Sequence, residues 1–183
     1  NMEHVLEIKN LKVSIPTPQG KVEAVRDVSL NLNKGEVLAI VGESGCGKSM
    51  LCKSIMKLLP KNAIIEGGQI LANGVDITSY GEKDMTKLRG KFFSMIFQDP
   101  MTALDPTMTV GAQIAEAVLV HSPKMGKQEV YRRVIELMEL VGIRNPEQRY
   151  HLYPYNFSGG MRQRVLLAAA MLDDPEILIL DEP

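Results

Sequence analysis

The sequence lacks a surplus of charge, a long apolar run and a set of paired cysteines. Its formal net charge is −1, so no basic excess is available to hold a phosphate backbone by counterion release. The longest unbroken apolar run is the segment 165–172, whereas a membrane-spanning helix needs roughly 20 residues. Cys46 and Cys52 are too few for a disulfide framework and lack the paired spacing of a zinc site. We therefore expect a cytoplasmic protein with reduced thiols, no membrane span and no nucleic acid as its main partner.

The composition is that of an ordinary globular protein, with 45% hydrophobic and 23% charged residues among 183. Residues 5–97 carry mostly β-strand signals, with apolar residues alternating at 28–32 and a compact apolar strand expected at 37–41. An Asn-Gly turn at 73–74 between two short apolar runs predicts a hairpin. One helix is expected in this region, at 48–59, because Pro60 would stop it.

Beyond residue 99 the apolar spacing becomes helical. Two stripes carry this signal, namely Val110, Ile114, Ala117 and Val118, then Val130, Val134, Leu137, Met138 and Val141. A further helix is expected at 161–172 and a short strand at 177–180. These elements predict a mainly parallel α/β sheet, with an antiparallel β region before it and a helical lobe inserted into it.

The segment 42–49 matches the pattern G-x-x-x-x-G-K-[ST] of a phosphate-binding P-loop. It follows an expected strand and opens an expected helix, which is the context that supports a P-loop against a glycine-rich turn without a ligand. The expected nucleotide-binding residues are Gly42, Glu43, Ser44, Gly45, Cys46, Gly47, Lys48, Ser49 and Met50.

The chemistry of phosphate binding requires these residue types. Glycines let several backbone N–H groups converge on one phosphate, and the helix that follows adds the positive end of its dipole. Lys48 supplies a compact charge for the β- and γ-phosphates, and the Ser49 hydroxyl is placed to ligate Mg²⁺. The expected ligand is a nucleoside triphosphate with magnesium. Met50 stands where a second hydroxyl would add a contact, and Cys46 is either a small residue that fits the loop or a thiol activated at a helix N-terminus.

The apolar strand at 177–180 ends in Asp181 and Glu182. Paired acids at a strand end are often a helix cap or a solvated turn, but a P-loop upstream favours catalysis. Asp181 would then join the Mg²⁺ shell, and Glu182 would orient and deprotonate the attacking water.

The segment 157–164 reads Phe-Ser-Gly-Gly-Met-Arg-Gln-Arg and resembles the signature sequence of ABC ATPases. The resemblance implies that Ser158, Gly159 and Gly160 form a phosphate-binding helix N-terminus for ATP held by a second subunit. The segment 97–100 resembles the Q-loop of the same family, so Gln98 would contact Mg²⁺ or the attacking water and report nucleotide state to the helical lobe. Lys48, Gln98 and Glu182 are thus the expected catalytic residues, with Ser49, Gln98 and Asp181 as metal ligands.

The resemblance covers essentially the whole chain and implies a P-loop NTPase fold with a RecA-like sheet. It places a β region and P-loop core at 1–98, a helical subdomain ending in the signature at 99–160, and a return to the core at 161–183, all within one domain. The segments 42–49, 97–106 and 157–164 look most like the ATP-binding subunits of oligopeptide, dipeptide and nickel importers. Such subunits pair on two membrane permeases at the cytoplasmic face of the bacterial membrane, and a solute-binding protein delivers the cargo.

Three features depart from the family's pattern. The family stacks adenine on an aromatic residue near position 15, where this chain has Ile15, and no Phe, Tyr or Trp precedes Tyr80. Phe157 and Met161 replace the usual leucine and glutamine of the signature. The family also continues past the acidic strand with a dimer-contacting loop and a histidine, so we expect a longer natural protein and slow turnover by these 183 residues alone.

Two other functions stay open at this point. A soluble ABC ATPase of the repair or translation type would couple to nucleic acid, which the neutral charge balance disfavours. A nucleotide-binding module without turnover would describe the chain if catalysis needs residues that lie beyond it.

Overall fold

The computed structural model of the chain describes residues 3–42, 47–96 and 104–181. The chain divides into two compact units, with the boundary between Arg89 and Gly90; we call the part up to Arg89 unit 1 and the part from Gly90 unit 2. Within the described ranges, no helix combines the length and apolar character needed to cross a membrane.

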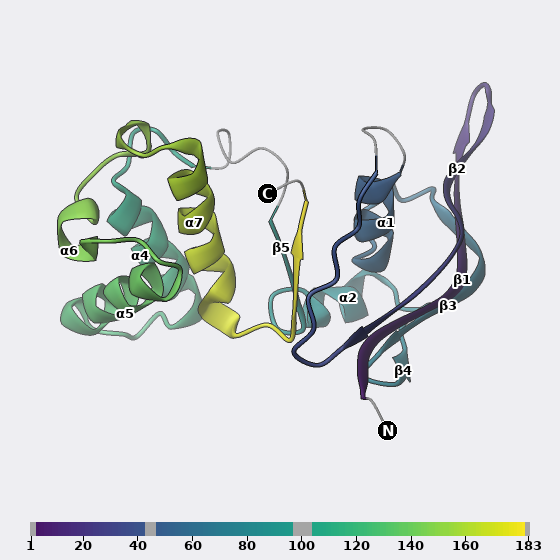
Figure 1. Ribbon diagram of the computed structural model, residues 1–183, viewed down its shortest axis with the longest axis horizontal. Helices are drawn as coiled ribbons and strands as arrows, with labels where there is room; N and C mark the ends of the chain where they lie inside the picture. Colours follow the sequence, from purple (N-terminus) through teal and green to yellow (C-terminus); the bar gives the residue numbers. More distant parts are fainter. Residues whose placement is uncertain (1–2, 43–46, 97–103, 182–183) are drawn as a thin grey trace. The chain divides into compact units, whose positions relative to one another are not determined.

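Unit 1 is built on a four-stranded antiparallel sheet in the order β2-β1-β3-β4 (Figure 1). Its strands are β1 (His4–Thr17), β2 (Gly20–Asn33), β3 (Ile64–Ala72) and β4 (Val75–Asp76). Apolar side chains of β1 form much of its core, because alternate residues of a strand face the same side of the sheet. The antiparallel β region expected from the sequence is thus present.

Each of the three long strands of this sheet has a residue with a left-handed backbone conformation, at neighbouring positions. Asn10 and Asp27 both have positive φ, 47° and 53°, and the Asn10 amide donates to the Asp27 carboxylate at 3.0 Å. On the other side of β1, Gly68 has φ 86°, and a Cβ there would lie 2.4 Å from the Asn10 carbonyl oxygen. Only glycine fits this close approach, and both pairings of β1 shift register beside it, between Ile8 and Val13.

The hairpin expected at the Asn-Gly turn is confirmed. Ala72 pairs with Val75, and Asn73 and Gly74 have φ of 47° and 78°, as a two-residue type I′ turn requires. The alternation expected at 28–32 also lies in a strand, β2, where the apolar residues are half-buried and the intervening ones exposed.

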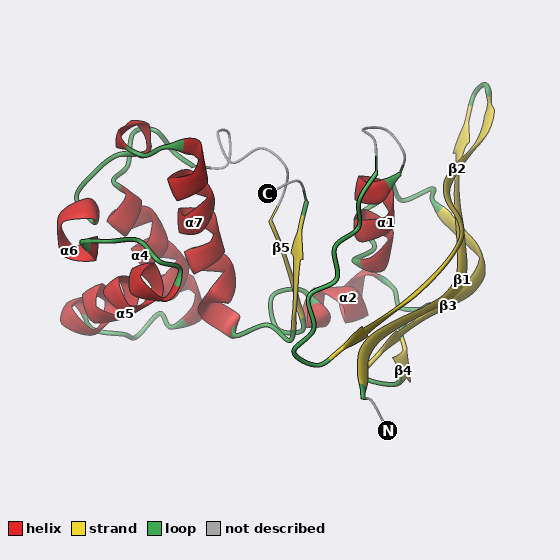
Figure 2. Cartoon of the chain, in the orientation of Figure 1, coloured by secondary structure: helices red, strands yellow, loops and turns green. Residues whose placement is uncertain are grey.

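The helices of unit 1 differ from the sequence-based expectation (Figure 2). Helix α1 (Lys48–Ile55) ends at its C-cap Met56, well before Pro60, because Lys57 adopts a left-handed conformation with φ 53° that ends the helix. Helix α2 (Glu82–Leu88) was not expected; only its middle residue Met85 is fully buried, so it lacks an apolar stripe.

The strand expected at 37–41 is wrong for this structure. The segment forms no strand, and Val37 and Val41 are 94% and 88% exposed. An apolar strand of the buried type needs hydrogen-bonded neighbours, and none of the strands in the described ranges pairs with it.

Unit 2 contains a two-stranded parallel sheet and a group of helices. Strand β5 (Phe93–Ile96) pairs with β6 (Ile177–Leu180) from Phe93 opposite Ile177 to Ile96 opposite Leu180. The strand expected at 177–180 and its parallel pairing are therefore confirmed.

The helices in the described part of unit 2 are α4 (Val110–His121), α5 (Lys127–Leu140), α6 (Pro146–Arg149) and α7 (Gly159–Ala170). The 3₁₀ turns Pro154–Asn156 and Met171–Asp173 flank α7. In Figure 1, α4, α5 and α7 lie together, and their apolar faces make one core. This core contains Leu104, Val110, Ile114, Val118, Val130, Val134, Leu137, Met138, Ile143, Phe157, Val165 and Ala168.

Both helical stripes expected from the sequence contribute to this core: Val141 packs against it half-buried, and of the first stripe Val110, Ile114 and Val118 belong to it but Ala117 does not. The first turn of α4 is held by residues that precede α7, since the Val110 N–H donates to the Leu152 carbonyl at 2.8 Å. The Gly111 N–H likewise donates to the Tyr150 carbonyl at 2.9 Å. The start of the lobe is thereby tied to the chain that leads to the signature segment.

Candidate nucleotide-binding site

The described part of the P-loop lies at the N-terminus of α1 in unit 1. Gly47 is the N-cap, with φ 98°, a conformation that a residue with a Cβ seldom adopts. The first helical hydrogen bond runs from the Leu51 N–H to the Gly47 carbonyl at 2.9 Å. The Lys48 ammonium donates to the Gly42 carbonyl. This hydrogen bond connects the two described ends of the loop.

This arrangement suits an anion. The first turn of an α-helix presents N–H groups without intrahelical acceptors, and the helix dipole places positive charge there. No acidic residue stands in the first turn of α1, and Gly47 makes no side-chain cap hydrogen bond. A phosphate group could therefore approach the backbone and meet the Lys48 ammonium, whose hydrogen bond to Gly42 is exposed.

Several expected site residues lie outside the described part of the chain. These are Glu43, Ser44, Gly45, Cys46, Gln98 and Glu182. Among the expected magnesium ligands, Ser49 lies on α1 in unit 1 and Asp181 follows β6 in unit 2. Hydroxyl and carboxylate oxygens are ligands that Mg²⁺ accepts, so the donor chemistry of the described residues fits this ion.

The signature segment forms the N-terminus of α7 in unit 2. Ser158 is the N-cap, and its hydroxyl oxygen accepts from the Met161 N–H at 3.3 Å. Gly159 and Gly160 are exposed, and a Cβ built on either would meet no heavy atom within 4 Å. Their backbone is thus open to a large ligand, and the serine orients the helix end that would receive it.

Three contacts hold this helix end in place. The Phe157 ring is 4% exposed within the core of the lobe. The Arg162 side chain donates from Nε to the Pro154 carbonyl at 2.8 Å. From the next turn, Arg164 donates from Nη1 to the Gly142 carbonyl at 2.9 Å, at the C-terminus of α5. The start of α7 is therefore held in place by the lobe's core and by the segments at Pro154 and Gly142.

Strand β6, which leads to Asp181, ends at the same edge of the sheet as its neighbour β5. Because β5 and β6 are parallel and in register, both point their carboxyl ends toward one edge of the sheet, where ligands of such sheets bind. The Asp181 N–H donates to the Ile96 carbonyl at 3.0 Å, and Asp181 is only 7% exposed. A buried carboxylate at this edge is well placed for a cation.

The chain that follows Gln98 is described from Leu104 onward and folds back on α4. The Asp105 N–H donates to the Gln113 side-chain oxygen at 2.9 Å, and the Gln113 amide donates to the Asp105 carbonyl at 2.7 Å. Hydrogen bonds from the Thr107 hydroxyl and N–H lower the pKa of the Asp105 carboxyl. Asp105 is thereby held against α4 by two hydrogen bonds with Gln113.

The expected adenine-binding position contains an aliphatic pair. Ile15 on β1 lies opposite Val22 on β2; Ile15 is half-buried and Val22 is 46% exposed. The pair forms an apolar surface without a ring, which could hold a base by contact but not by stacking.

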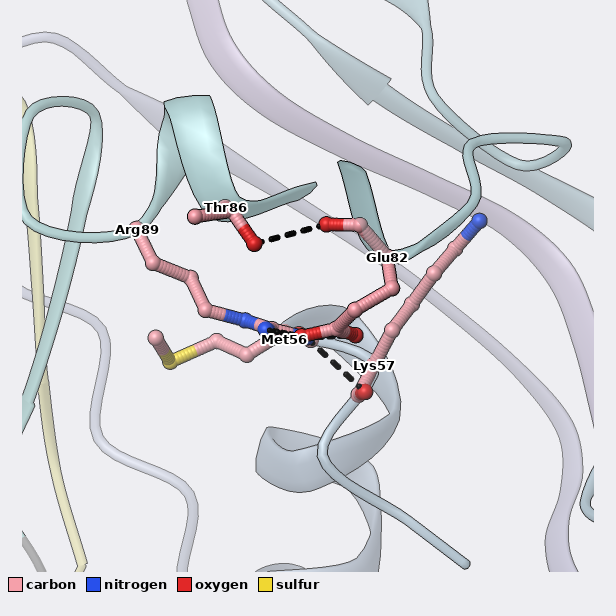
Figure 3. Close-up of polar contacts among 5 residues, drawn as sticks. All are labelled: Met56, Lys57, Glu82, Thr86 and Arg89. Carbon is pink, nitrogen blue, oxygen red and sulfur yellow. Dashed lines mark hydrogen bonds and ion pairs between the residues drawn. The ribbon is translucent and has the colours of Figure 1, made fainter. Parts of the chain in front are cut away.

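Sequence reasoning missed Arg89, whose side chain contacts the C-terminal end of α1 (Figure 3). No local signal could have identified it, because its partners at Met56 and Lys57 are backbone carbonyls more than 30 positions earlier.

Comparison with known proteins shows similarity to one family. The sequence profile of a family described as ABC transporter matches residues 25–183. The chain is 52% identical over 183 residues to the dipeptide transport ATP-binding protein DppD of Bacillus subtilis (strain 168), covering 100% of this chain and 54% of that protein. It is 51% identical over 180 residues to the oligopeptide transport ATP-binding protein OppD of the same strain, covering 98% of this chain and 50% of that protein.

Solved structures with a similar fold include cbiO1 from Clostridium perfringens, described as part of the ABC transporter complex cbiONQ. The TM-score is 0.79 at 27% identity, covering 99% of this chain and 66% of that one. The ATP-binding cassette MJ0796, a dimer bound to ADP and Pi, matches with a TM-score of 0.76 at 23% identity, over 96% of this chain and 72% of that one. This chain spans about half the length of the curated relatives it matches.

Proposed function

The chain belongs to the ABC transporter family, and from this premise we propose that it is the ATP-binding and ATP-hydrolysing part of a bacterial peptide importer. The observation that carries the nucleotide-binding part is the N-terminus of α1, where a left-handed Gly47 and the Lys48 ammonium, which donates to the Gly42 carbonyl, would bind an anion. The names of its relatives, which are peptide transport ATP-binding proteins, support the choice of cargo.

In this proposal Lys48 binds the β- and γ-phosphates of ATP, and the residues Gly42 to Met50 surround them with backbone donors. Ser49, Gln98 and Asp181 would hold a magnesium ion, which would supply positive charge to offset that of the phosphates. Gln98 orients the attacking water, and Glu182 accepts its proton. Ile15 and Val22 contact the base, so discrimination between ATP and GTP is weak.

A second copy or a related subunit completes the site. Ser158, Gly159 and Gly160 at the start of α7 would bind the nucleotide held by the P-loop of the partner subunit. The dimeric state of MJ0796 with ADP and Pi is consistent with this arrangement. The helical lobe would dock on one of two membrane permeases at the cytoplasmic face, and a solute-binding protein would deliver the peptide outside.

The nucleotide-binding part is tested by Lys48→Ala. We expect it to abolish tight MgATP binding measured by calorimetry, because backbone donors cannot replace a compact charge at the γ-phosphate. Lys53→Ala, in the last turn of the same helix, is the matched control and should bind as the parent chain does. Equal affinity of the Lys48→Ala variant and the parent would show that this loop is not the site.

The importer assignment is tested separately, against a soluble ABC ATPase coupled to nucleic acid. In the genome that encodes this chain, we expect genes for two permeases and a solute-binding protein beside it. We also expect the protein to sediment with membranes only when those permeases are co-expressed. Binding to nucleic acid at physiological salt, with no permease-dependent sedimentation, would favour the soluble alternative.

A further inference from the structure

Helix α1 is too short to fix its own position. Its eight residues, Lys48–Ile55, span about 12 Å, and isolated helices below about 12 residues are marginal in water. Leu51, Ser54 and Ile55 are its buried residues. The placement of the two residues at its start, Lys48 and Ser49, therefore depends on how its other end is held.

The C-terminal end of α1 is capped by Lys57 in the left-handed αL conformation, which a lysine rarely adopts. The Leu58 N–H donates to the Lys53 carbonyl at 2.8 Å, and the Lys57 N–H donates to the Ser54 carbonyl at 3.1 Å, which is the pattern of a Schellman motif. Lys57, at the position that favours glycine, has φ 53°. A left-handed lysine is costly unless other contacts hold it.

Arg89 supplies contacts at this end (Figure 3). Its Nε and Nη2 atoms donate to the Met56 carbonyl at 3.1 and 2.9 Å, and Nη2 also donates to the Lys57 carbonyl at 3.0 Å. The Schellman motif uses the carbonyls of Lys53 and Ser54, so Arg89 binds two carbonyls that the motif does not use. The guanidinium thus meets the negative end of the helix dipole, where a cation is stabilising.

The guanidinium is itself fixed. Its Nη1 atom lies 2.5 Å from Oε1 of Glu82, at the start of α2, and the Arg89 side chain is only 19% exposed. Hydrogen bonds from Arg89 lower the pKa of the Glu82 carboxyl. The Lys57 ammonium adds a second tie by donating to the Thr78 carbonyl at 2.7 Å. Hydrogen bonds from the Arg89 guanidinium and the Lys57 ammonium therefore tie the end of α1 to the segment 78–89.

We propose that Arg89 is a positioning residue for the nucleotide site: it holds the C-terminal end of α1 against α2 and so fixes the direction in which the opposite end presents Lys48 and Ser49 to the phosphates. This inference rests on the proposed binding of ATP at that end. Because a short helix moves as a rigid rod, a tilt at Met56 displaces its first turn. The planar fork of arginine donates to Glu82 and to both carbonyls together, which a lysine ammonium on a flexible stem cannot match.

The test compares MgATP affinity of Arg89→Ala and Arg89→Lys by calorimetry, at a temperature where circular dichroism shows each variant folded. We expect affinity to fall about tenfold for the alanine variant and about threefold for the lysine variant. Arg26→Ala is the matched control in the same unit, since the ion pair of Arg26 with Glu23 is exposed and the Arg26 side chain is 78% exposed. Its affinity should equal that of the parent.

Chemical rescue separates positioning from a general loss of stability. Guanidinium ions at low millimolar concentration should restore most of the MgATP affinity of Arg89→Ala, because the ion can occupy the vacated space between Glu82 and the two carbonyls. Urea at the same concentration has a similar shape but no charge, and it should restore none. If the alanine variant fails to fold, the lysine variant and Glu82→Gln carry the test, and both should bind MgATP more weakly than the parent.

The outcomes are distinct. If folded Arg89 variants lose thermal stability but bind MgATP as tightly as the parent, while Lys48→Ala does not bind, Arg89 is structural only and the inference is overturned. If Lys48→Ala binds as the parent does, the proposed nucleotide site itself fails. Weaker binding by the Arg89 variants, with guanidinium rescue and an unchanged Arg26→Ala, supports the positioning role.

Discussion

Gly111→Ala should destabilise the helical lobe, although alanine normally stabilises a helix. Gly111 lies in the first turn of α4, and a Cβ there would be 2.2 Å from Cγ of Tyr150. Ordinary contact begins near 3.4 Å, so the Tyr150 ring would have to move by more than 1 Å. Cγ is the atom of the ring nearest the backbone, which leaves little freedom for that movement.

The surroundings of the ring make this shift costly. The Tyr150 carbonyl accepts the Gly111 N–H at 2.9 Å, and the ring centroid lies 5.0 Å from that of Tyr131. Overpacking costs about 1–3 kcal/mol, and the gain in helix propensity from glycine to alanine is about 1 kcal/mol. Because movement of the ring also strains a backbone hydrogen bond, we expect the upper half of that range and a net loss of about 1–2 kcal/mol.

Urea unfolding followed by far-ultraviolet circular dichroism measures this loss. Gly67→Ala on β3 is a control for the added Cβ itself, since a Cβ there would meet Lys12 Cδ at 3.9 Å, and it should not destabilise the protein. In a Tyr150→Ala background, adding Gly111→Ala should cost nothing and gain up to about 1 kcal/mol. A single Gly111→Ala variant as stable as the parent would refute the reasoning and mean that the ring moves freely.

Two further predictions concern unit 1. Ile15→Tyr should tighten MgATP binding about fivefold or more by calorimetry, because stacking on a base is worth about 1–3 kcal/mol; unchanged or weaker binding would place the base elsewhere. Glu66→Gln should lower stability at neutral pH, since hydrogen bonds from Lys21 and Ser14 lower the pKa of the Glu66 carboxyl in the folded state. A depressed pKa means that this stabilisation is present above the ordinary value of 4.5 and disappears as the pH falls. Urea unfolding should therefore show the difference from the parent shrinking below that pH; a difference independent of pH would contradict it.

Local patterns in the sequence determined most of the elements and the chemistry of the site. The turn at Asn73 and Gly74, the two apolar stripes of the helical lobe and the strand β6 were all predictable, because each depends on spacing over a few neighbouring residues. Ser158 is the N-cap of α7, in agreement with the expected helix start. The P-loop and signature patterns also point to a nucleotide, since the residue types needed to bind phosphate follow one another along the chain.

The tertiary structure alone decided features that depend on residues distant in the sequence. The segment 37–41 has the apolar composition of a strand, but a strand forms only where neighbours pair with it. Helix α1 ends at Met56 and not at Pro60, because Arg89 and the ammonium of Lys57 stabilise a left-handed lysine that local propensity disfavours. Close approaches such as Gly111 to Tyr150 likewise arise from packing between segments, and no periodicity along the chain encodes them.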